Sequence, residues 1–433
     1  MEKAPDPAAQ TWLRIQDGTL RAEDVPLTTV ADAYGTPAYV YSRTAIESAY
    51  REIDAAISFA PRRMIAYAVK ANGNLSVLNT LARLGSGVEV VSGGELARAL
   101  RARVPASRIV MSGVGKTPRE IGEALDAGVR CINMENEDEV GLLSSLSAER
   151  GIRARVSIRI NPDIDAGAHP YIATGLHDTK FGLELPAAMR TAERVASDPN
   201  LELAGVSMHI GSQLGTTDPL EEAVAILGGV AARLLDAGHP LSFIDVGGGW
   251  PIRYGDETAD FPTAAAFGEA IRRGLEASGL GTDTLELLTE PGRYLVGDAG
   301  VLLTRVLSVK RTPKKRFVIV DAAMTELIRP ALYGAYHEVL AVSPRPGSVK
   351  ADLVGPVCET GDFLARDRDL PLLEAGDLVA IRGAGAYARE MASTYNGRVP
   401  AAEVMVAGDE ALLVRRRPEY DEALWQFDEV FWD

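Results

Sequence analysis

The chain has 433 residues, of which 46% are hydrophobic and 24% are charged, a length that favours two domains unless one is a large α/β barrel. Its formal net charge of −15 argues against a nucleic-acid partner, because the phosphates would be repelled. No apolar run approaches the roughly 20 residues that span a membrane, and the first ten residues do not resemble a secretory signal, so we expect a cytoplasmic protein without a membrane partner.

Strand and helix signals alternate regularly from about residue 62, after an isolated strand signal at 36–42. The predicted strands cover residues 63–69, 87–91, 108–112, 129–134, 155–160, 204–210, 242–248 and 285–290. The predicted helices cover residues 75–85, 93–102, 117–128, 136–150, 186–197, 219–238 and 263–279. Eight strands alternating with helices predict a (β/α)8 barrel, with an open doubly wound sheet as the alternative.

Polar residues or glycines follow all eight predicted strands, which favours the barrel over the open sheet. A barrel gathers its functional groups at the carboxyl ends of its strands, whatever its chemistry. Those positions are Lys70, Ser92, Ser112, Asn133, Arg159, His209, Gly247 to Gly249, and Glu290.

The alternation of strands and helices ends after Glu290, where strand signals continue with few helices between them. These strands are predicted at 301–309, 317–321, 350–358, 377–382 and 403–414. They predict an all-β domain, which the isolated strand at 36–42 could complete. We therefore expect an α/β chain with a TIM-like barrel over 43–291 and a β-sandwich or barrel-like domain made of 1–42 and 292–433. The basic stretches 310–316 and 415–418 are interpreted as solvated turns.

Lys70 ends the stretch "YAVKANGN", where a buried strand gives way to small and polar residues. Lysines often flank strands and extend to water, and alone this would be the better interpretation. A lysine within a ring of strand ends is partly desolvated, which lowers its pKa and lets its amine attack a carbonyl. That chemistry belongs to aldolases or to pyridoxal-phosphate enzymes.

An anion site is predicted at "DVGGGWP", because three successive glycines after a strand allow backbone N–H groups to approach a phosphate. A glycine turn without a ligand is the alternative. The neighbouring loop "HIGSQ" adds the hydroxyl of Ser212, and its His209 could be a core histidine or could stack on a flat aromatic cofactor.

"TEPGRY" ends the eighth strand with Glu290, which is either part of an ordinary salt-bridged turn or the partner of a pyridine nitrogen. Cys131 and Cys358 are too few and too far apart to predict a disulfide framework or a zinc site, so no metal is expected.

The motifs "YAVKAN", "HIGSQ", "DVGGGWP" and "EPGRY", in this order, resemble the pyridoxal-phosphate-dependent decarboxylases of ornithine, diaminopimelate and arginine, which have the alanine racemase-like barrel fold. The similarity covers nearly the whole chain and is strongest to the diaminopimelate-specific members. It includes the stretches at 169–183, 327–339, 355–365 and 383–398. Ala323, Thr325 and Glu326 differ from the residues that the family often has at these positions.

The resemblance implies a role for each matching residue. Lys70 would hold pyridoxal 5'-phosphate covalently, His209 would stack on its ring, and Glu290 would pair with the ring nitrogen. The other implied cofactor-binding residues are Arg159, Ser212, Gly248, Gly249, Gly292, Arg293 and Tyr387. Substrate contacts are implied for Arg293, Arg329, Tyr333, Glu359 and Tyr387. Cys358 would protonate the α-carbon after carbon dioxide leaves, and in this family Cys358 and Glu359 reach the partner subunit's cofactor in a homodimer with shared active sites.

The resemblance thus implies decarboxylation of meso-2,6-diaminopimelate to L-lysine, the last step of lysine biosynthesis. A carboxylate at the ring nitrogen suits decarboxylation, whereas a racemase of this fold is expected to have an arginine there. Two alternatives stay open. One is a related decarboxylase of ornithine, lysine or a specialised amino acid, and the other is a non-catalytic pyridoxal-phosphate carrier. The preference for diaminopimelate depends on Arg329, Tyr333 and Glu359, which could bind a distal amino and carboxylate pair.

Overall fold

The computed structural model describes residues 12–165, 180–255 and 260–424. The chain divides into two compact units. The barrel unit consists of Glu47–Ile252 and Ala259–Leu295, and the β unit consists of Met1–Ile46, Arg253–Thr258 and Val296–Asp433. Residues 169–179 of the family-like stretch 169–183 lie outside the described residues.

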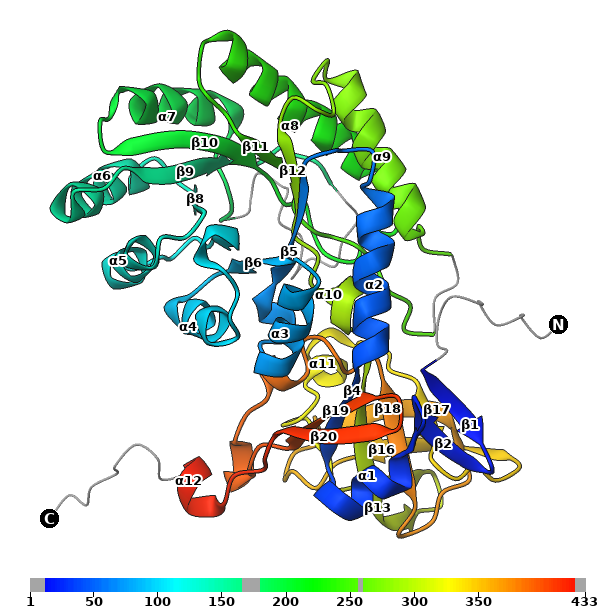
Figure 1. Cartoon of the computed structure of the whole chain (residues 1–433). Coiled ribbons are helices and arrows are strands. Elements are labelled where there is room, and N and C mark those ends of the chain that lie inside the picture. The colour runs from blue at the N-terminus through cyan, green and yellow to red at the C-terminus, as the bar shows by residue number, and fades with distance from the viewer. Residues whose placement is uncertain (1–11, 166–179, 256–259, 425–433) are drawn as a thin grey trace, which may run out of the picture. The chain divides into compact units, whose positions relative to one another are not determined.

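Within the described residues of the barrel unit, eight parallel strands close into a ring in the order β10-β11-β12-β5-β6-β7-β8-β9 (Figure 1). The strands are β5 (Arg63–Ala68), β6 (Gly87–Val90), β7 (Ile109–Met111), β8 (Cys131–Met134), β9 (Ala154–Arg159), β10 (Leu201–Ser207), β11 (Phe243–Asp245) and β12 (Glu286–Thr289). Each of them lies at one of the strands predicted from the sequence. The prediction of a closed barrel is confirmed, and the open doubly wound sheet is wrong.

Helices alternate with these strands and surround the ring (Figure 1). They are α2 (Arg43–Ala56), α3 (Leu75–Arg83), α4 (Gly93–Arg101), α5 (Pro118–Ala127), α6 (Glu139–Arg150), α7 (Leu185–Ser197), α8 (Asp218–Asp236) and α9 (Ala264–Ala277). Local sequence sets several of their ends. Thr117 and Glu120 form a capping box at the start of α5, and Gly128 ends that helix in the left-handed conformation.

The barrel interior changes from apolar to polar along the strand direction. Its apolar cluster consists of Met64, Ala66, Val110, Cys131, Ala204, Phe243 and Leu288. Because side chains on a strand alternate between two faces, the residue two positions further along points to the same side. That step leads from Val110 to Ser112, from Cys131 to Asn133, from Phe243 to Asp245 and from Leu288 to Glu290. The sequence therefore places a polar layer on an apolar floor, at the ends of the strands where function is expected.

The β unit is built around one large sheet with the order β17-β16-β14-β13-β4-β19-β20, and β18 and β15 extend it from β13. Its strands are β4 (Ala38–Ser42), β13 (Gly300–Arg311), β14 (Arg316–Val320), β15 (Val339–Ala341), β16 (Ser348–Val354), β17 (Phe363–Pro371), β18 (Leu378–Arg382), β19 (Ala402–Ala407) and β20 (Glu410–Arg415). The N-terminal strand β4 pairs with both β13 and β19, so the early segment does complete the C-terminal sheet.

The remaining elements of the β unit are short. Strands β1 (Leu13–Gln16), β2 (Thr19–Ala22) and β3 (Val25–Pro26) form a small separate sheet, and the helices are α1 (Leu27–Tyr34), α11 (Arg329–Tyr333) and α12 (Tyr420–Leu424). Within the basic stretch 310–316, residues 312–315 form the turn between the antiparallel strands β13 and β14, and the remaining residues belong to these strands. Among the described helices, none has the length and apolar character that a membrane span requires.

Candidate active site

Lys70 lies in a single 3-10 turn directly after β5, with 42% of its side chain exposed. Its Nζ contacts both carboxylate oxygens of Glu89, at 3.1 and 3.3 Å. Glu89 is on the neighbouring strand β6 and its side chain is buried. The lysine amine is thus held at the rim of the barrel by a carboxylate, where a carbonyl compound can reach it.

The glycine loop after β11 is close-packed against its neighbours. Gly247 has a φ of 71°, which few other residues adopt, and its N–H donates to Oδ1 of Asp245 at 2.9 Å. A Cβ on Gly248 would lie 2.5 Å from the carbonyl oxygen of Glu290. These two positions therefore require glycine, and the approach of this backbone to a phosphate stays a prediction.

His209 is oriented by this loop, because its Nδ1 accepts a hydrogen bond from the N–H of Gly248 at 3.1 Å. Burial, followed by the positive charges of Arg159 and Lys70, holds the pKa of His209 well below its ordinary value. The imidazole is therefore neutral, with Nδ1 as the acceptor and the proton on Nε2.

The loop that carries Ser212 is tied to the loop after β11 by Gln213. The side chain of Gln213 donates to the carbonyl oxygen of Ile252 at 2.5 Å and accepts from its N–H at 3.1 Å. Arg293 begins the short helix α10 (Arg293–Val296) directly after Gly292, and it lies 3.4 Å from the hydroxyl of Ser212. Ser212, Arg293 and the glycines thus belong to one connected set of loops.

Asp245 and Glu290 form a buried carboxyl pair at the ends of β11 and β12. Oδ2 of Asp245 and Oε1 of Glu290 are buried and have no donor from the described residues. Burial and the neighbouring Asp245 raise the pKa of Glu290 well above its ordinary value, and burial raises the pKa of Asp245 to about 6. Two neighbouring buried carboxyl groups do not readily both carry a charge, so we expect one of them to be protonated.

Arg159, at the end of β9, pairs with Glu135, and the two atoms Nη1 and Oε1 are 2.8 Å apart. Its guanidinium lies over the ring of Phe181 at 4.9 Å from the ring centroid. The arginine also contributes to the low pKa of His209, so it is electrostatically part of the same site.

In the β unit, Arg329 is buried at the start of α11. Its Nη1 donates to Nε2 of His337 at 2.9 Å, and its guanidinium lies 4.6 Å from the centroid of the Tyr254 ring. Nδ1 of His337 donates to the carbonyl oxygen of Arg382 at 2.7 Å, so Nε2 is the acceptor and the ring is neutral. The guanidinium is thereby fixed in one orientation.

The other predicted residues of the β unit are on loops or short helices. Tyr333 ends α11, and Tyr387 has a φ of 54°, a strained conformation that is common at binding sites. Cys358 and Glu359 are exposed, and the N–H of Cys358 donates to Oδ1 of Asn396 at 3.0 Å. Within the described residues, no group of acidic, histidine or cysteine side chains could hold a metal ion.

Sequence reasoning missed Glu89, Glu135, Asp245, His337 and Tyr254. A signal existed for three of them. Glu89 is a charge inside the apolar strand "GVEVV", Asp245 follows Phe243 at the two-residue period of the barrel interior, and Glu135 comes directly after a predicted strand. Tyr254 is far from Arg329 in sequence, and His337 lies beyond the end of α11, so the sequence contains no signal that their side chains would meet the guanidinium.

Comparisons with known proteins agree with this geometry. Residues 43–297 match the family model described as pyridoxal-dependent decarboxylase, pyridoxal binding domain. Diaminopimelate decarboxylase from Pseudomonas fluorescens is 52% identical over 402 residues, which are 92% of this chain and 94% of that protein.

Two solved structures are also similar over most of their length. Diaminopimelate decarboxylase from Helicobacter pylori, complexed with L-lysine, is 39% identical with a TM-score of 0.88, over 93% of this chain and 99% of the other. The M. jannaschii enzyme, in co-complex with L-lysine, is 33% identical with a TM-score of 0.92, over 97% and 98%. The chain therefore belongs to the family of pyridoxal-dependent decarboxylases.

Proposed function

We propose that this chain is a pyridoxal-phosphate-dependent carboxy-lyase that converts meso-2,6-diaminopimelate to L-lysine and carbon dioxide. The observation that carries the proposal is the buried Oε1 of Glu290, which has no donor from the described residues at the end of β12. A buried polar atom without a partner is costly, so a ligand that can hydrogen-bond to it is expected there. Relatives named diaminopimelate decarboxylase, 40% to 52% identical, support the substrate.

The residues present fit pyridoxal phosphate. Lys70 would provide the amine that binds its aldehyde, and the loop at Gly248 and Gly249, with Ser212 and the backbone at Gly292 and Arg293, would bind its phosphate. His209 would cover one ring face, and Glu290 would face the ring nitrogen. Arg159 and Tyr387 would make further contacts to the cofactor.

When bound, the protonated ring would supply the electron sink that accepts the electron pair of the broken carbon–carbon bond. The protein's part is to hold protons at defined atoms. The raised pKa of Glu290 keeps a proton within the Glu290–Asp245 pair, where it is available to a ring nitrogen at Oε1. The neutral His209 contributes an uncharged ring face and does not compete for that proton.

Substrate recognition is proposed for Arg293, Arg329, Tyr333, Glu359 and Tyr387. Arg329 suits a second carboxylate on the substrate, because His337 and Tyr254 hold its guanidinium in one orientation before anything binds. Ornithine and lysine have no distal carboxylate, so a decarboxylase specific for them would gain nothing from such a fixed arginine.

An amino-acid panel tests the substrate, with carbon dioxide release from meso-diaminopimelate, its LL isomer, lysine and ornithine as the readout. We expect release from the meso isomer alone, and we expect Arg329→Met to raise its KM about tenfold or more, the scale of a charged hydrogen bond. Release from ornithine or lysine at an equal kcat/KM would favour the related decarboxylases instead.

We also propose a homodimer in which Cys358 and Glu359 reach the partner's cofactor, with Cys358 as the acid that protonates the product carbon. The exposure of Cys358 in the single chain supports a role at a surface between subunits. Lys70→Ala and Cys358→Ala should each be nearly inactive alone. After mixing and exchange, they should regain about one quarter of the activity, because half of the dimers then contain one intact site. No recovery after demonstrated exchange would contradict the shared site.

The free cysteines support the expectation of a reducing, cytoplasmic location, which stays a prediction.

A further inference from the structure

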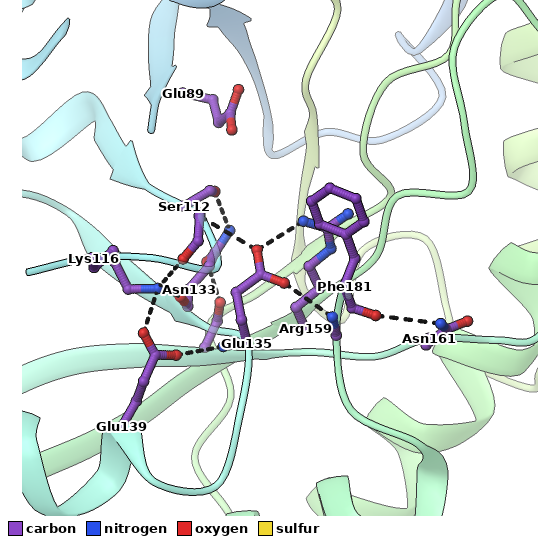
Figure 2. Close-up of polar contacts among 12 residues, drawn as sticks. Glu89, Ser112, Lys116, Asn133, Glu135, Glu139, Arg159, Asn161 and Phe181 are labelled. Atoms are coloured by element: carbon purple, nitrogen blue, oxygen red, sulfur yellow. Dashed lines mark hydrogen bonds and ion pairs between the residues drawn. The ribbon is translucent and has the colours of Figure 1, made fainter. Parts of the chain in front are cut away.

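A second set of buried charges lies at the ends of β7, β8 and β9, outside the residues with proposed contacts to the cofactor except for Arg159. Figure 2 shows that Lys116, Glu139, Glu135 and Arg159 form one connected chain of polar contacts. The side chains of Lys116 and Glu135 are 0% and 1% exposed, and that of Arg159 is 11% exposed. Two cations and two carboxylates give this cluster no net charge.

Glu135 is the centre of the cluster because both of its carboxylate oxygens are used. Oε1 accepts from Nη1 of Arg159 at 2.8 Å and from the N–H of Gly113 at 3.3 Å. Oε2 accepts from the N–H of Gly182 at 3.0 Å. One side chain therefore joins the arginine to the loop after β7 and to the turn that contains Phe181.

The backbone of Glu135 is held in turn by Glu139 and Lys116. Oε2 of Glu139 accepts from the N–H of Glu135 at 2.6 Å, and its Oε1 lies 2.7 Å from Nζ of Lys116. Lys116 also donates to the carbonyl oxygens of Gly113 and Asn133, at 2.6 and 2.8 Å. These contacts use all three donors of the lysine and leave Glu135 little freedom to move.

The turn after Lys180 completes the enclosure of Arg159. The ring of Phe181 lies against the guanidinium, and Asn161 donates to the carbonyl oxygen of Phe181 at 3.3 Å (Figure 2). The N–H of Leu183 donates to the carbonyl oxygen of Arg159 at 2.8 Å. One face of the guanidinium is thus covered by a ring while Nη1 is bound to a carboxylate.

We propose that Glu135 is a positioning residue that holds Arg159 in the single orientation in which the arginine contacts the cofactor. The inference rests on the proposed cofactor site, and it assigns to Glu135 a role that acts through Arg159. Without the carboxylate, Arg159 would keep an uncompensated charge in a buried place and would turn toward water. An arginine that changes orientation gives up its contact to the cofactor, or must lose rotamer freedom again when the cofactor binds.

A second arginine on the same strand offers a matched comparison. Arg155 pairs with Glu202 at 3.1 Å, near the other end of β9, and both side chains are about one third exposed, at 37% and 33%. The residue types and the strand are the same, but this pair is at the end of the barrel opposite to the site. Breaking the Arg155–Glu202 pair therefore shows how much cofactor affinity is lost when β9 loses any arginine–glutamate pair.

The test is a titration of the cofactor-free protein with pyridoxal phosphate, in which binding is measured by the absorbance of the lysine-bound cofactor. Glu135→Gln should weaken binding about 10- to 100-fold, the range for the loss of a charged, orienting hydrogen bond. Glu202→Gln should bind the cofactor as the wild type does. Equal affinity of Glu135→Gln and the wild type would overturn the proposal.

A double-mutant cycle separates positioning from a general structural effect. If Glu135 acts through Arg159, the change Glu135→Gln should have almost no further effect on affinity in an Arg159→Met background. A full 10-fold or larger additional loss in that background would overturn the proposal.

Folding is checked by the cooperative unfolding of each cofactor-free variant. Should Glu135→Gln not fold, Glu135→Asp replaces it. The aspartate keeps the charge but is too short to bridge Arg159 and Gly182, so the affinity of this variant for the cofactor should fall several-fold while its unfolding stays cooperative, and wild-type affinity would overturn the proposal. A wild-type protein that bound no cofactor would overturn the proposed function itself, and this inference with it.

Discussion

The two sides of the barrel mouth differ in how many hydrogen-bond donors their buried carboxyl groups have. At the ends of β7 to β9, every oxygen of Glu135 and Glu139 accepts from a cation or a backbone N–H. At the ends of β11 and β12, Oδ2 of Asp245 and Oε1 of Glu290 have no such donor from the described residues. The first side is satisfied by the protein alone, and the second is left for a ligand to satisfy.

The difference separates scaffold from binding site on physical grounds. A buried ion pair with complete hydrogen bonding is costly to break, whereas a buried carboxyl pair without donors reduces the stability of the folded chain. Proteins retain such a cost where function requires it. Variants on the satisfied side should therefore mainly affect stability and orientation, and variants on the unsatisfied side should mainly affect chemistry.

The largest effect is expected at the two lysines of the barrel mouth. The side chain of Lys70 is 42% exposed and contacts Glu89, whereas that of Lys116 is fully buried and donates to three acceptors. Borohydride reduction followed by peptide mapping should find the cofactor on Lys70 and none on Lys116. Lys70→Ala should lose the absorbance of the bound cofactor and all decarboxylation. A label on Lys116 would contradict the division into the two sides.

The next effect compares one carboxylate from each side. Glu290→Gln should slow decarboxylation about 100-fold or more, the scale of a lost electrostatic contact to the reacting group. The unfolding free energy of its cofactor-free form should stay equal or rise, because the substitution removes a buried carboxyl from the pair. Glu139→Gln should lower the unfolding free energy by about 3–5 kcal/mol, because it leaves Lys116 buried without its carboxylate. Urea unfolding measures the unfolding free energies of both variants. A Glu290→Gln variant less stable than Glu139→Gln would contradict the difference between the two sides.

The smallest effect is a pH dependence of stability that only the unsatisfied side should show. Burial raises the pKa of Asp245 from 3.8 to about 6, so the folded state favours the protonated form. The resulting stabilisation is complete below pH of about 4 and is lost as the pH rises through about 6, with a size of about 2–3 kcal/mol.

Asp245→Asn removes this titration but keeps an oxygen for the N–H of Gly247. Between pH 4 and 7, the unfolding free energy of the cofactor-free wild type should therefore fall relative to that of the variant. Parallel curves for the two proteins would show that Asp245 does not titrate in this range.

Much of the barrel could be predicted because its signals are local. Apolar runs of five to seven residues, separated by segments of helical period, mark all eight barrel strands within a few residues of their observed positions. In the β unit, β1, β2, β3, β15 and β17 were not predicted, and β19 and β20 were predicted as one strand. Strand β17 has exposed and charged residues such as Arg366 and Asp369, and its pairing with β16 rather than its own sequence makes it a strand.

The sequence by itself determined the barrel, the glycine loop, and the residues Lys70, His209 and Glu290 as candidates, because each is marked by a strand end or a short motif. Only the tertiary structure decided what holds these residues. Glu89 against Lys70, Glu135 against Arg159, and His337 against Arg329 are pairs formed across strands and loops. The sequence does not show whether the oxygens of an aspartate or glutamate will have hydrogen-bond donors. Burial of the side chain and the donors that the fold brings within reach decide this.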